Sequence, residues 1–364
     1  MTLHNGSYMS LLRLHPHDSV AVSTEAIAAG SVVEGLTVLS DIPSGHKIAT
    51  RDIDPGETIL KYGRIIGVAT SKIAEGEHVH SHNLSMASSE DRAAAQPLEQ
   101  SASPVAVAKT APVVENRETF LGYARPNGSV GTRNYLGILT SVNCSATVAR
   151  RIASHFTAER LSAFPNVDGV VALTQSGGCA MSDSDEGSEV LRRTIASYAN
   201  HPNFSATLLL GLGCEANQVN RIVPLTTGNI TATTIQDEGG TRAAIARGIA
   251  EIERLLPEAN EAQRTSQPVS KLVVGLQCGG SDGWSGITAN PALGLAMDML
   301  IANGGTAVLS ETPEIFGAEH LLTSRAEASV AAQLMERIAW WQQYAERQNN
   351  TLDNNLRMAI NSAE

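Results

Sequence analysis

The 364-residue sequence has few cysteines, no long apolar run and no excess of positive charge. Its four cysteines form no C-x₂-C pair, which disfavours a structural zinc site. No segment approaches the roughly 18–20 apolar residues of a membrane span, and the N-terminus has no apolar core of signal-peptide length. The net charge of −11 argues against a broad nucleic-acid-binding surface. We therefore expect a cytoplasmic protein without nucleic-acid or membrane partners.

The length of the chain and its turn residues predict more than one domain. Residues 1–86 contain short apolar segments separated by Pro- and Gly-containing turns, which is typical of a small all-β domain. Residues 87–116 are rich in Ala, Ser, Pro and Glu without an apolar period, so we expect an interdomain linker. Further on, strand patterns alternate with helix patterns. This alternation predicts parallel-sheet α/β domains at residues 117–262 and 269–364.

Histidine is the unusual feature of the first region. The residues concerned are His46, His78, His80 and His82. The last three alternate within residues 78–84, a segment predicted as a strand, where alternate side chains share one face. Neutral imidazole is the commonest metal ligand, so a metal site is one interpretation and a polar strand face in water is the other. The neighbouring Glu77 would favour a cation such as Fe²⁺ or Mn²⁺.

Each cysteine closely follows an apolar segment that is predicted to be a strand. The cysteines are Cys144, Cys179, Cys214 and Cys278. Because the carboxyl ends of parallel strands meet at one edge of a sheet, we expect these residues to line a site. Three functional interpretations stay open: metal or cluster ligands, a thiolate nucleophile, or small residues that shape an anion pocket. The structural alternative is a small buried hydrophobic residue, as free cysteine often is.

Two glycine-rich stretches add candidate binding groups. Residues 272–294 begin as an apolar strand, turn through glycines and small polar residues, and reach Asn290-Pro291, where a helix can begin. Backbone N–H groups and hydroxyls in such a turn can approach a ligand closely, so this stretch is predicted to form one wall of an active site. Arg125 and Arg133 lie in the other stretch and could bind a carboxylate through two parallel hydrogen bonds.

Six motifs, in order along the chain, resemble those of the altronate/galactarate dehydratase family, and its altronate branch more than its galactarate branch. Three resemble the family's small β-clip-like SAF domain: GHK at 45–47, KYGRIIGVAT at 61–70 and HVHSHNL at 78–84. Three resemble its main α/β region: GYARPNGSVGTRN at 122–134, GLGCEANQ at 211–218 and CGGSDGWSGITANPALG at 278–294. Six ordered motifs are far more specific than a lone glycine motif.

The resemblance implies a metal-dependent hydro-lyase that converts a sugar acid, an altronate-like aldonate or galactarate, to a 2-keto-3-deoxy acid with Fe²⁺ or Mn²⁺. Removing a proton next to a carboxylate is difficult and hydroxide is a poor leaving group, so a chelating cation and a positioned base would both contribute. The implied metal ligands are His46, His80 and His82. The implied proton-transfer groups are His46, His80 and Lys47, the last if burial lowers its pKa.

The resemblance also implies a set of substrate-binding residues. They are Arg133, Asn134, Cys144, Cys179, Cys214, Glu215, Cys278, Ser281, Asp282, Ser285 and Asn290. The expected substrate is a small sugar acid, and the expected assembly is a homodimer or a larger homo-oligomer.

Two departures from the family pattern leave alternatives open. Gln175 stands where the family usually has a histidine in a THxxGC-type segment, and glutamine cannot transfer protons. The family's further C-terminal glycine-rich motifs are absent, so residues 269–364 are expected to be the start of a longer domain. The alternatives are a related lyase that releases sulfite from a sulfonated hydroxy acid and a non-catalytic sugar-acid-binding paralogue. A nicotinamide oxidoreductase is disfavoured, because no GxGxxG follows a strand with an acidic residue about 20 positions later.

Overall fold

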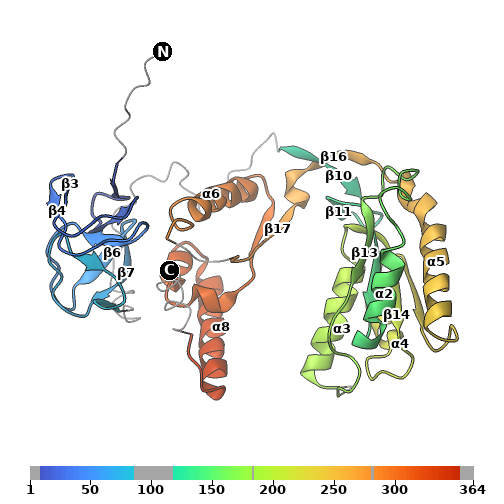
Figure 1. Ribbon diagram of the computed structural model, residues 1–364. Coiled ribbons are helices and arrows are strands. Elements are labelled where there is room, and N and C mark those ends of the chain that lie inside the picture. The colour runs from blue at the N-terminus through green and yellow to red at the C-terminus, as the bar shows by residue number, and fades with distance from the viewer. Residues whose placement is uncertain (1–8, 86–117, 183, 280–282, 353–364) are drawn as a thin grey trace, which may run out of the picture. The chain divides into compact units, whose positions relative to one another are not determined.

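The computed structural model describes residues 9–85, 118–182, 184–279 and 283–352 (Figure 1). The chain groups into two compact units, which are residues 115–272 with 303–305, and residues 1–114 with 273–302 and 306–364. We refer to residues 9–85 as the N-terminal domain and to residues 118–268 as the central domain. Within the described residues, no helix combines the length and the apolar character needed to cross a membrane.

The N-terminal domain consists of short strands, as its turn-rich sequence predicts. They are β1 (Leu11–Leu12), β2 (Val20–Ser23), β3 (Val32–Val33), β4 (Leu36–Thr37), β5 (Lys47–Ala49), β6 (Thr58–Lys61), β7 (Arg64–Ala69), β8 (His78–Val79) and β9 (Leu84–Ser85). They pair antiparallel in the orders β1-β2-β5-β8 and β6-β7-β9, and β3 pairs with β4. Fully buried isoleucines such as Ile48 and Ile59 pack in separate apolar clusters, and this burial stabilises strands too short to persist alone.

The central domain is built on a parallel sheet of order β13-β12-β14-β15. Its strands are β12 (Tyr135–Thr140), β13 (Gly169–Leu173), β14 (Phe204–Gly211) and β15 (Ile230–Thr234). Its helices are α2 (Ala146–Ala153), α3 (Glu186–Ala199), α4 (Val219–Ile222) and α5 (Thr241–Glu261), with 3₁₀ turns η1 (Asn143–Ser145) and η2 (Val223–Leu225). The predicted α/β class is therefore confirmed for this region.

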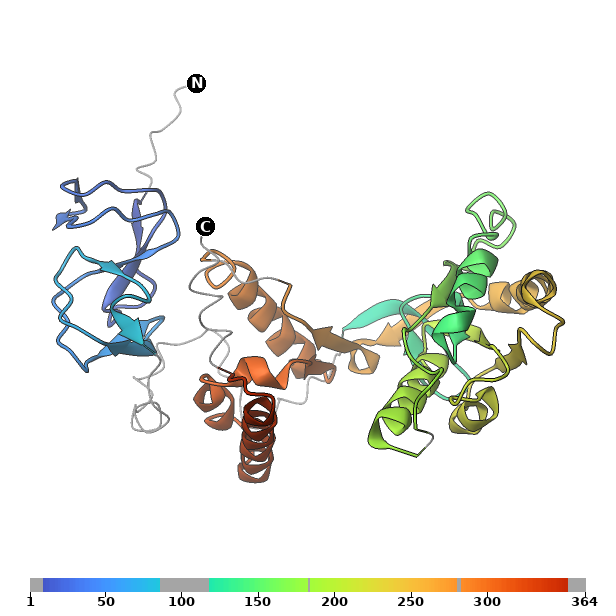
Figure 2. The ribbon, with the colours of Figure 1, turned by 60° about the horizontal axis from the view of Figure 1, so that its bottom comes forward.

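Helices cover both faces of this sheet, which explains why its strands are almost continuously apolar. Residues of α2 and α5 pack with Leu136, Leu208 and Leu210 on one face, whereas residues of α3 and α4 pack with Leu139 and Leu209 on the other. In both views, α3 (yellow-green) and α5 (gold) lie on opposite sides of the strands (Figures 1 and 2). The polar ends of the strands are left for the connecting loops.

The order of the strands puts a switch point at β12. The chain passes from β12 to β13 on one side and then returns to β14 on the other side of β12. In open parallel sheets, ligands bind outside the carboxyl ends of the strands at such a point. A small antiparallel sheet of order β11-β10-β16 completes the domain, from β10 (Thr119–Ala124), β11 (Val130–Gly131) and β16 (Arg264–Pro268). Residues 264–268, which lie between the two predicted α/β domains, thus pair with the central domain.

The remaining described residues form a second, smaller parallel arrangement. Its elements are η3 (Val269–Lys271), β17 (Val273–Leu276), α6 (Ala289–Ala302), β18 (Thr306–Leu309), η4 (Thr312–Ile315), α7 (Glu319–Thr323) and α8 (Ala328–Arg347). β17 and β18 pair in parallel, and α6 connects them along the chain. Helix α6 begins one residue before Asn290-Pro291, the predicted start. This region buries few side chains, among them Leu300 and Ile338.

Candidate functional site

Four imidazoles of the N-terminal domain gather where β5 pairs with β8. Nδ1 of His46 lies 2.9 Å from Nε2 of His78. The rings of His46 and His80 are stacked with centroids 5.0 Å apart, and the ring of His82 lies 5.4 Å from that of His78. The three ligands implied by the resemblance therefore belong to one group, here called the imidazole patch. His78 is the member that the site prediction omitted, although it begins the same histidine motif.

A turn, and not the predicted strand, brings these imidazoles together. β8 ends at Val79, and the chain then turns before β9. The side chain of Asn83, 2% exposed, closes the turn, since its Oδ1 accepts a hydrogen bond from the His80 N–H at 2.9 Å and its Nδ2 donates to the His78 carbonyl at 2.9 Å. Asparagine is suited to this role because its amide can both accept and donate within a turn.

Burial perturbs two ionisable groups in this region. Burial first, and then the neighbouring imidazoles and Lys47, lower the pKa of His78 to about 4, so this ring is neutral at pH 7. Burial, followed by the charge of Lys61, lowers the pKa of Lys47 to about 8. This pKa is close enough to neutral for Lys47 to act as a general base. Lys47 pairs with Val79, on the sheet face opposite to that of Ile48 and His78. Lys47 is therefore separated from the imidazole patch by the sheet.

The imidazole patch offers ring nitrogens, which are the kind of donor atom that binds divalent cations. Two ring nitrogens face each other, and neutral imidazole is the form that binds metals. Nevertheless, no group of three or more His, Cys, Asp and Glu side chains in the described part of the chain is arranged to hold a metal ion. The rings of His46, His80 and His82 would have to turn before three of their nitrogens could face one cation.

Three of the four cysteines lie together at the carboxyl edge of the central sheet. Cys144 follows β12, Cys179 follows β13 and Cys214 follows β14, which are three adjacent strands. Desolvation by surrounding atoms first, and then the neighbouring thiols of Cys179 and Cys214, raise the pKa of the Cys144 thiol. The strand pattern predicted this convergence for all four cysteines, and it holds for three, because β17 pairs with β18 in a separate sheet. Cys278 follows β17 and belongs to the other compact unit.

Hydrogen bonds between the loops hold the three cysteines in place. The Asn143 N–H donates to the Gly177 carbonyl at 2.9 Å, and the Ala216 N–H donates to the Cys179 carbonyl at 3.1 Å. Gly178 has a φ of +92°, and a Cβ there would lie 2.3 Å from a carbonyl oxygen of the loop after β12. The loops therefore approach each other more closely than any side chain at Gly178 would allow.

Glu215 braces the loop after β14. It is 2% exposed. Its carboxylate accepts hydrogen bonds from the Ser141 hydroxyl at 2.7 Å and from the N–H groups of Leu212 at 3.1 Å and Gly213 at 2.6 Å. These protein donors satisfy most of the carboxylate's capacity, so the loop that carries Cys214 is tied to the end of β12.

Gln175 forms a similar brace after β13. Its Nε2 donates to the Ser141 carbonyl at 3.0 Å, and its Oε1 accepts from the Gly177 N–H. Nδ2 of Asn217 donates to the same Ser141 carbonyl at 2.9 Å. The amide of Gln175 therefore links two of the loops that carry cysteines.

Arg133 and Asn134 lie at the other end of β12, because they precede the strand whose carboxyl end carries Cys144. The Arg133 guanidinium is 3.3 Å from the Asp168 carboxylate, and its side chain is 56% exposed. These two residues and the three clustered cysteines, all predicted to bind substrate, thus occupy opposite edges of one sheet and do not form a single pocket.

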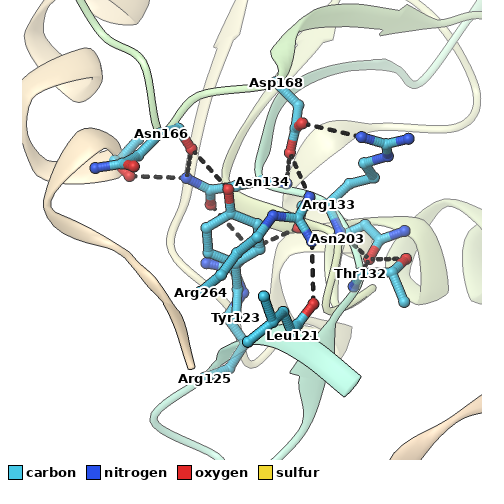
Figure 3. Close-up of polar contacts among 11 residues, drawn as sticks. Leu121, Tyr123, Arg125, Thr132, Arg133, Asn134, Asn166, Asp168, Asn203 and Arg264 are labelled. Carbon is cyan, nitrogen blue, oxygen red and sulfur yellow. Dashed lines mark hydrogen bonds and ion pairs between the residues drawn. The ribbon is translucent and has the colours of Figure 1, made fainter. Parts of the chain in front are cut away.

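Asn134 is fully buried within a network of protein partners (Figure 3). Its Nδ2 donates to the carbonyls of Asn166 at 2.7 Å and Ala259 at 2.8 Å, and its Oδ1 accepts from the Arg125 guanidinium at 3.0 Å. These bonds join the loops before β12 and β13 to the end of α5. They leave the side chain no surface for a substrate.

The candidates after β17 are only partly described. Ser281 and Asp282 lie outside the described residues. Ser285 precedes α6, and its carbonyl accepts a hydrogen bond from the Asn290 N–H at 2.9 Å. Asn290 is exposed in the first turn of α6.

Three models from one family match successive parts of the chain. The altronate/galactarate dehydratase SAF domain matches residues 9–87, the second domain of D-galactarate dehydratase/altronate hydrolase matches residues 122–260, and the C-terminal domain of D-galactarate/altronate dehydratase matches residues 269–359. The chain belongs to the altronate/galactarate dehydratase family. The resemblance inferred from six motifs is thereby confirmed.

Relatives from this family are similar to most of the chain. The chain is 39% identical to the altronate dehydratase of Escherichia coli (strain K12) over 326 residues, which cover 86% of this chain and 62% of that protein. It is 36% identical to the galactarate dehydratase (L-threo-forming) of the same organism over 347 residues, which cover 92% of this chain and 65% of that protein. The chain thus spans somewhat less than two thirds of the length of these relatives.

A third relative consists of two subunits. The chain is 32% identical to the beta subunit of (2R)-sulfolactate sulfo-lyase from Chromohalobacter salexigens over 209 residues, which cover 57% of this chain and 50% of that subunit. It is 38% identical to the alpha subunit over 73 residues, which cover 17% of this chain and 78% of that subunit.

Proposed function

We propose that this protein is a metal-dependent hydro-lyase that dehydrates a sugar acid, an altronate-like aldonate or galactarate, to a 2-keto-3-deoxy acid. The observation that carries this proposal is the similarity to altronate dehydratase over 86% of the chain. The test is to incubate the purified protein with Fe²⁺ or Mn²⁺ and a panel of hexonates and hexarates. A 2-keto-3-deoxy product is expected. Absence of product across the whole panel would overturn the proposal.

The imidazole patch supports the metal part of this proposal. His46, His80 and His82 would hold the cation, and His78 would remain a neutral neighbour. When bound, Fe²⁺ or Mn²⁺ would supply positive charge that stabilises the negative charge produced by removing a proton next to a carboxylate. Metal content should fall to background in His80→Ala and His82→Ala. The exposed His17, in the same domain, gives the matched control His17→Ala.

In this proposal, His46, His80 or Lys47 transfers the proton. An imidazole nitrogen that binds the cation cannot accept a proton at the same time, so a base and a ligand must be different nitrogens. A variant that keeps its metal but loses activity therefore identifies the base. A variant that loses both identifies a ligand. Lys47→Met tests the third candidate, since it lies on the other face of the sheet.

A related lyase that expels sulfite is the second candidate function. It is favoured by the identity with both subunits of (2R)-sulfolactate sulfo-lyase. Sulfite release from a sulfonated hydroxy acid, without a keto-deoxy product from any hexonate, would support this alternative. Thermal stabilisation by a sugar acid without turnover of either substrate class would instead support a non-catalytic binding protein.

A further inference from the structure

Strand β15 forms an open edge of the central sheet. Among the described strands, it pairs only with β14. The Ile235 N–H donates to the Gly211 carbonyl of β14 at 3.0 Å. Successive residues of a strand direct their backbone N–H and C=O groups to opposite sides, so residues 231, 233 and 235 face β14. The backbone groups of residues 230, 232 and 234 therefore point away from the sheet, and Ala232, at the centre of the strand, is exposed.

This edge lacks the residues that usually prevent a further strand from pairing. Exposed edges are commonly protected by proline or by charged side chains. The sequence of β15 is ITATT, which contains neither proline nor a charged residue. At the opposite edge of the sheet, by contrast, every residue of β13 is partly covered. β15 is therefore the edge that is better suited to accept another strand.

A groove of about 300 Å³ lies between this edge and α5. Residues of β15 line one side, and Arg247 and Glu251 of α5 line the other. The Glu251 side chain is 9% exposed, and its carboxylate lies 2.7 Å from the Arg254 guanidinium. The Arg247 side chain is 59% exposed and lies 4.0 Å from the Glu238 carboxylate, too far for a hydrogen bond. A partly enclosed negative charge and an extended positive charge thus lie about one helical turn apart beside the open edge.

The edge and its charges are complementary to those of a second copy. In an antiparallel pair about a two-fold axis at Ala232, the N–H and C=O of this residue bond to the same groups of the other copy. The groove places Arg247 and Glu251 level with the centre of β15, so the axis passes between them. Arg247 of each copy then faces Glu251 of the other, which brings opposite charges together on both sides of the axis.

The other face of the sheet adds apolar surface near this edge. Ile230 of β15 packs in the same apolar cluster as Val223 of η2. Leu225, in the same 3₁₀ turn, is 48% exposed. A specific dimer usually buries at least about 1,000 Å² of surface, and a five-residue edge alone does not supply that area. In a symmetric pair, α5 on one face and η2 on the other would supply the remainder.

We propose that β15 pairs antiparallel with β15 of a second copy of this chain, so that two central sheets join into one. A second copy is the partner that the charges select, because a strand of unrelated sequence carries no matching arginine and glutamate beside it. The partner adds at the side of the sheet, so the loops that carry the three clustered cysteines at its carboxyl end remain accessible. The pairing does not depend on which reaction the protein catalyses.

Sedimentation equilibrium of the full chain tests the role of the strand. We expect a dimer for the wild type and a monomer for Ala232→Pro, because proline removes the N–H at the axis but no hydrogen bond to β14. Ala232→Val keeps that N–H and suits a strand, so it is the matched control and should remain a dimer.

A cross-link tests the position of the axis. Opposed Cα atoms in a hydrogen-bonded antiparallel pair lie about 5.5 Å apart, a separation that a disulfide spans. Ala232→Cys should therefore form a disulfide-linked dimer when the protein is exposed to dissolved oxygen. The wild type, which has four exposed cysteines of its own, measures the background of such cross-linking.

The charges are tested separately from the strand. Arg247→Glu would replace two attractions across the axis by two repulsions, so the Kd of the dimer should rise at least about tenfold, and less at high salt. Arg242→Glu is the matched control. It makes the same change in net charge on an exposed residue of the same helix, roughly 140° away around the helix axis, and should leave the Kd unchanged.

Four results would overturn the assignment. They are a monomeric wild type, undiminished dimerisation of Ala232→Pro or of Arg247→Glu, equal weakening by Arg242→Glu and Arg247→Glu, and no cross-linking of Ala232→Cys above the background. Far-UV circular dichroism with an unchanged Tm shows that a monomeric variant is still folded. If Ala232→Pro does not fold, the cross-link and the charge variants still decide between the outcomes.

Discussion

Replacing Asn134 by alanine should destabilise the central domain. The side chain is fully buried, and it makes three hydrogen bonds of 2.7–3.0 Å to groups on three different segments. Alanine would remove the amide but leave the carbonyls of Asn166 and Ala259 and the guanidinium of Arg125 in place. Their original partner in the network of Figure 3 would be gone.

The magnitude follows from the bonds that are lost. Each hydrogen bond contributes about 0.5–1.5 kcal/mol net, and a buried carbonyl left without a partner costs about 1–3 kcal/mol. These terms overlap, because the chain relaxes around the deletion, so we expect the free energy of unfolding to fall by about 3 kcal/mol. In a domain of this size each kcal/mol shifts Tm by about 2–4 °C, which gives a decrease of roughly 6–12 °C.

Thermal unfolding followed by circular dichroism measures this shift, and Arg133→Ala is the matched control. Arg133 is the preceding residue, but its side chain is 56% exposed and its ion pair with Asp168 lies at the surface. Such pairs contribute about 0–1 kcal/mol, so Tm should change little. If Asn134→Ala keeps the Tm of the wild type and raises KM for a sugar acid, the structural reasoning is wrong and the substrate-binding role predicted from the sequence is right.

Two further predictions concern the central domain. Glu215→Gln would place an amide N–H group opposite backbone N–H groups that now donate to the carboxylate. The free energy of unfolding, measured by urea denaturation, should therefore fall by about 2 kcal/mol. An unchanged midpoint would contradict the bracing role of Glu215. Burial lowers the pKa of His201 below its unfolded value of about 6.5, so the unfolded chain binds the proton first and stability is lost as pH falls below that value. His201→Gln should flatten the decline in Tm between about pH 7 and pH 5, and a decline as steep as that of the wild type would refute this linkage.

The central sheet could be predicted because its strands are buried on both faces and therefore read as nearly continuous apolar runs. Leu208, Leu209 and Leu210 in β14 are all 2% exposed or less. The convergence of Cys144, Cys179 and Cys214 followed from the same pattern, because carboxyl ends of parallel strands share an edge. Spacing along the chain was sufficient information for that part of the site.

The remaining features depend on individual side-chain hydrogen bonds, which spacing does not reveal. Alternation suggested a strand through the histidine motif, but Asn83 stops it and folds His80 back toward His78. Likewise, a glycine-rich loop with an arginine and an asparagine is compatible with binding an anion. In the fold, Asn134 is instead turned inward and saturated by protein groups. Only the positions of those partners distinguish the two roles.

The role of Gln175 also depends on its individual hydrogen bonds. Because glutamine cannot titrate, its presence where the family pattern has histidine suggested a loss of proton transfer. In the structure its amide donates to the Ser141 carbonyl and accepts from the Gly177 N–H. A neutral histidine also has one donor and one acceptor nitrogen, so it can make the same two connections. Glutamine and histidine are therefore interchangeable at this position if its role is to join loops.

Two substitutions distinguish bracing from proton transfer. Gln175→Ala removes both hydrogen bonds, which should cost about 2 kcal/mol and lower Tm by roughly 4–8 °C. Gln175→His should keep Tm close to that of the wild type. If it instead raises kcat tenfold or more while Tm stays constant, the residue at this position takes part in proton transfer. Bracing would then be a secondary role, because a group that only joins loops cannot change the rate of a proton transfer without changing the loops.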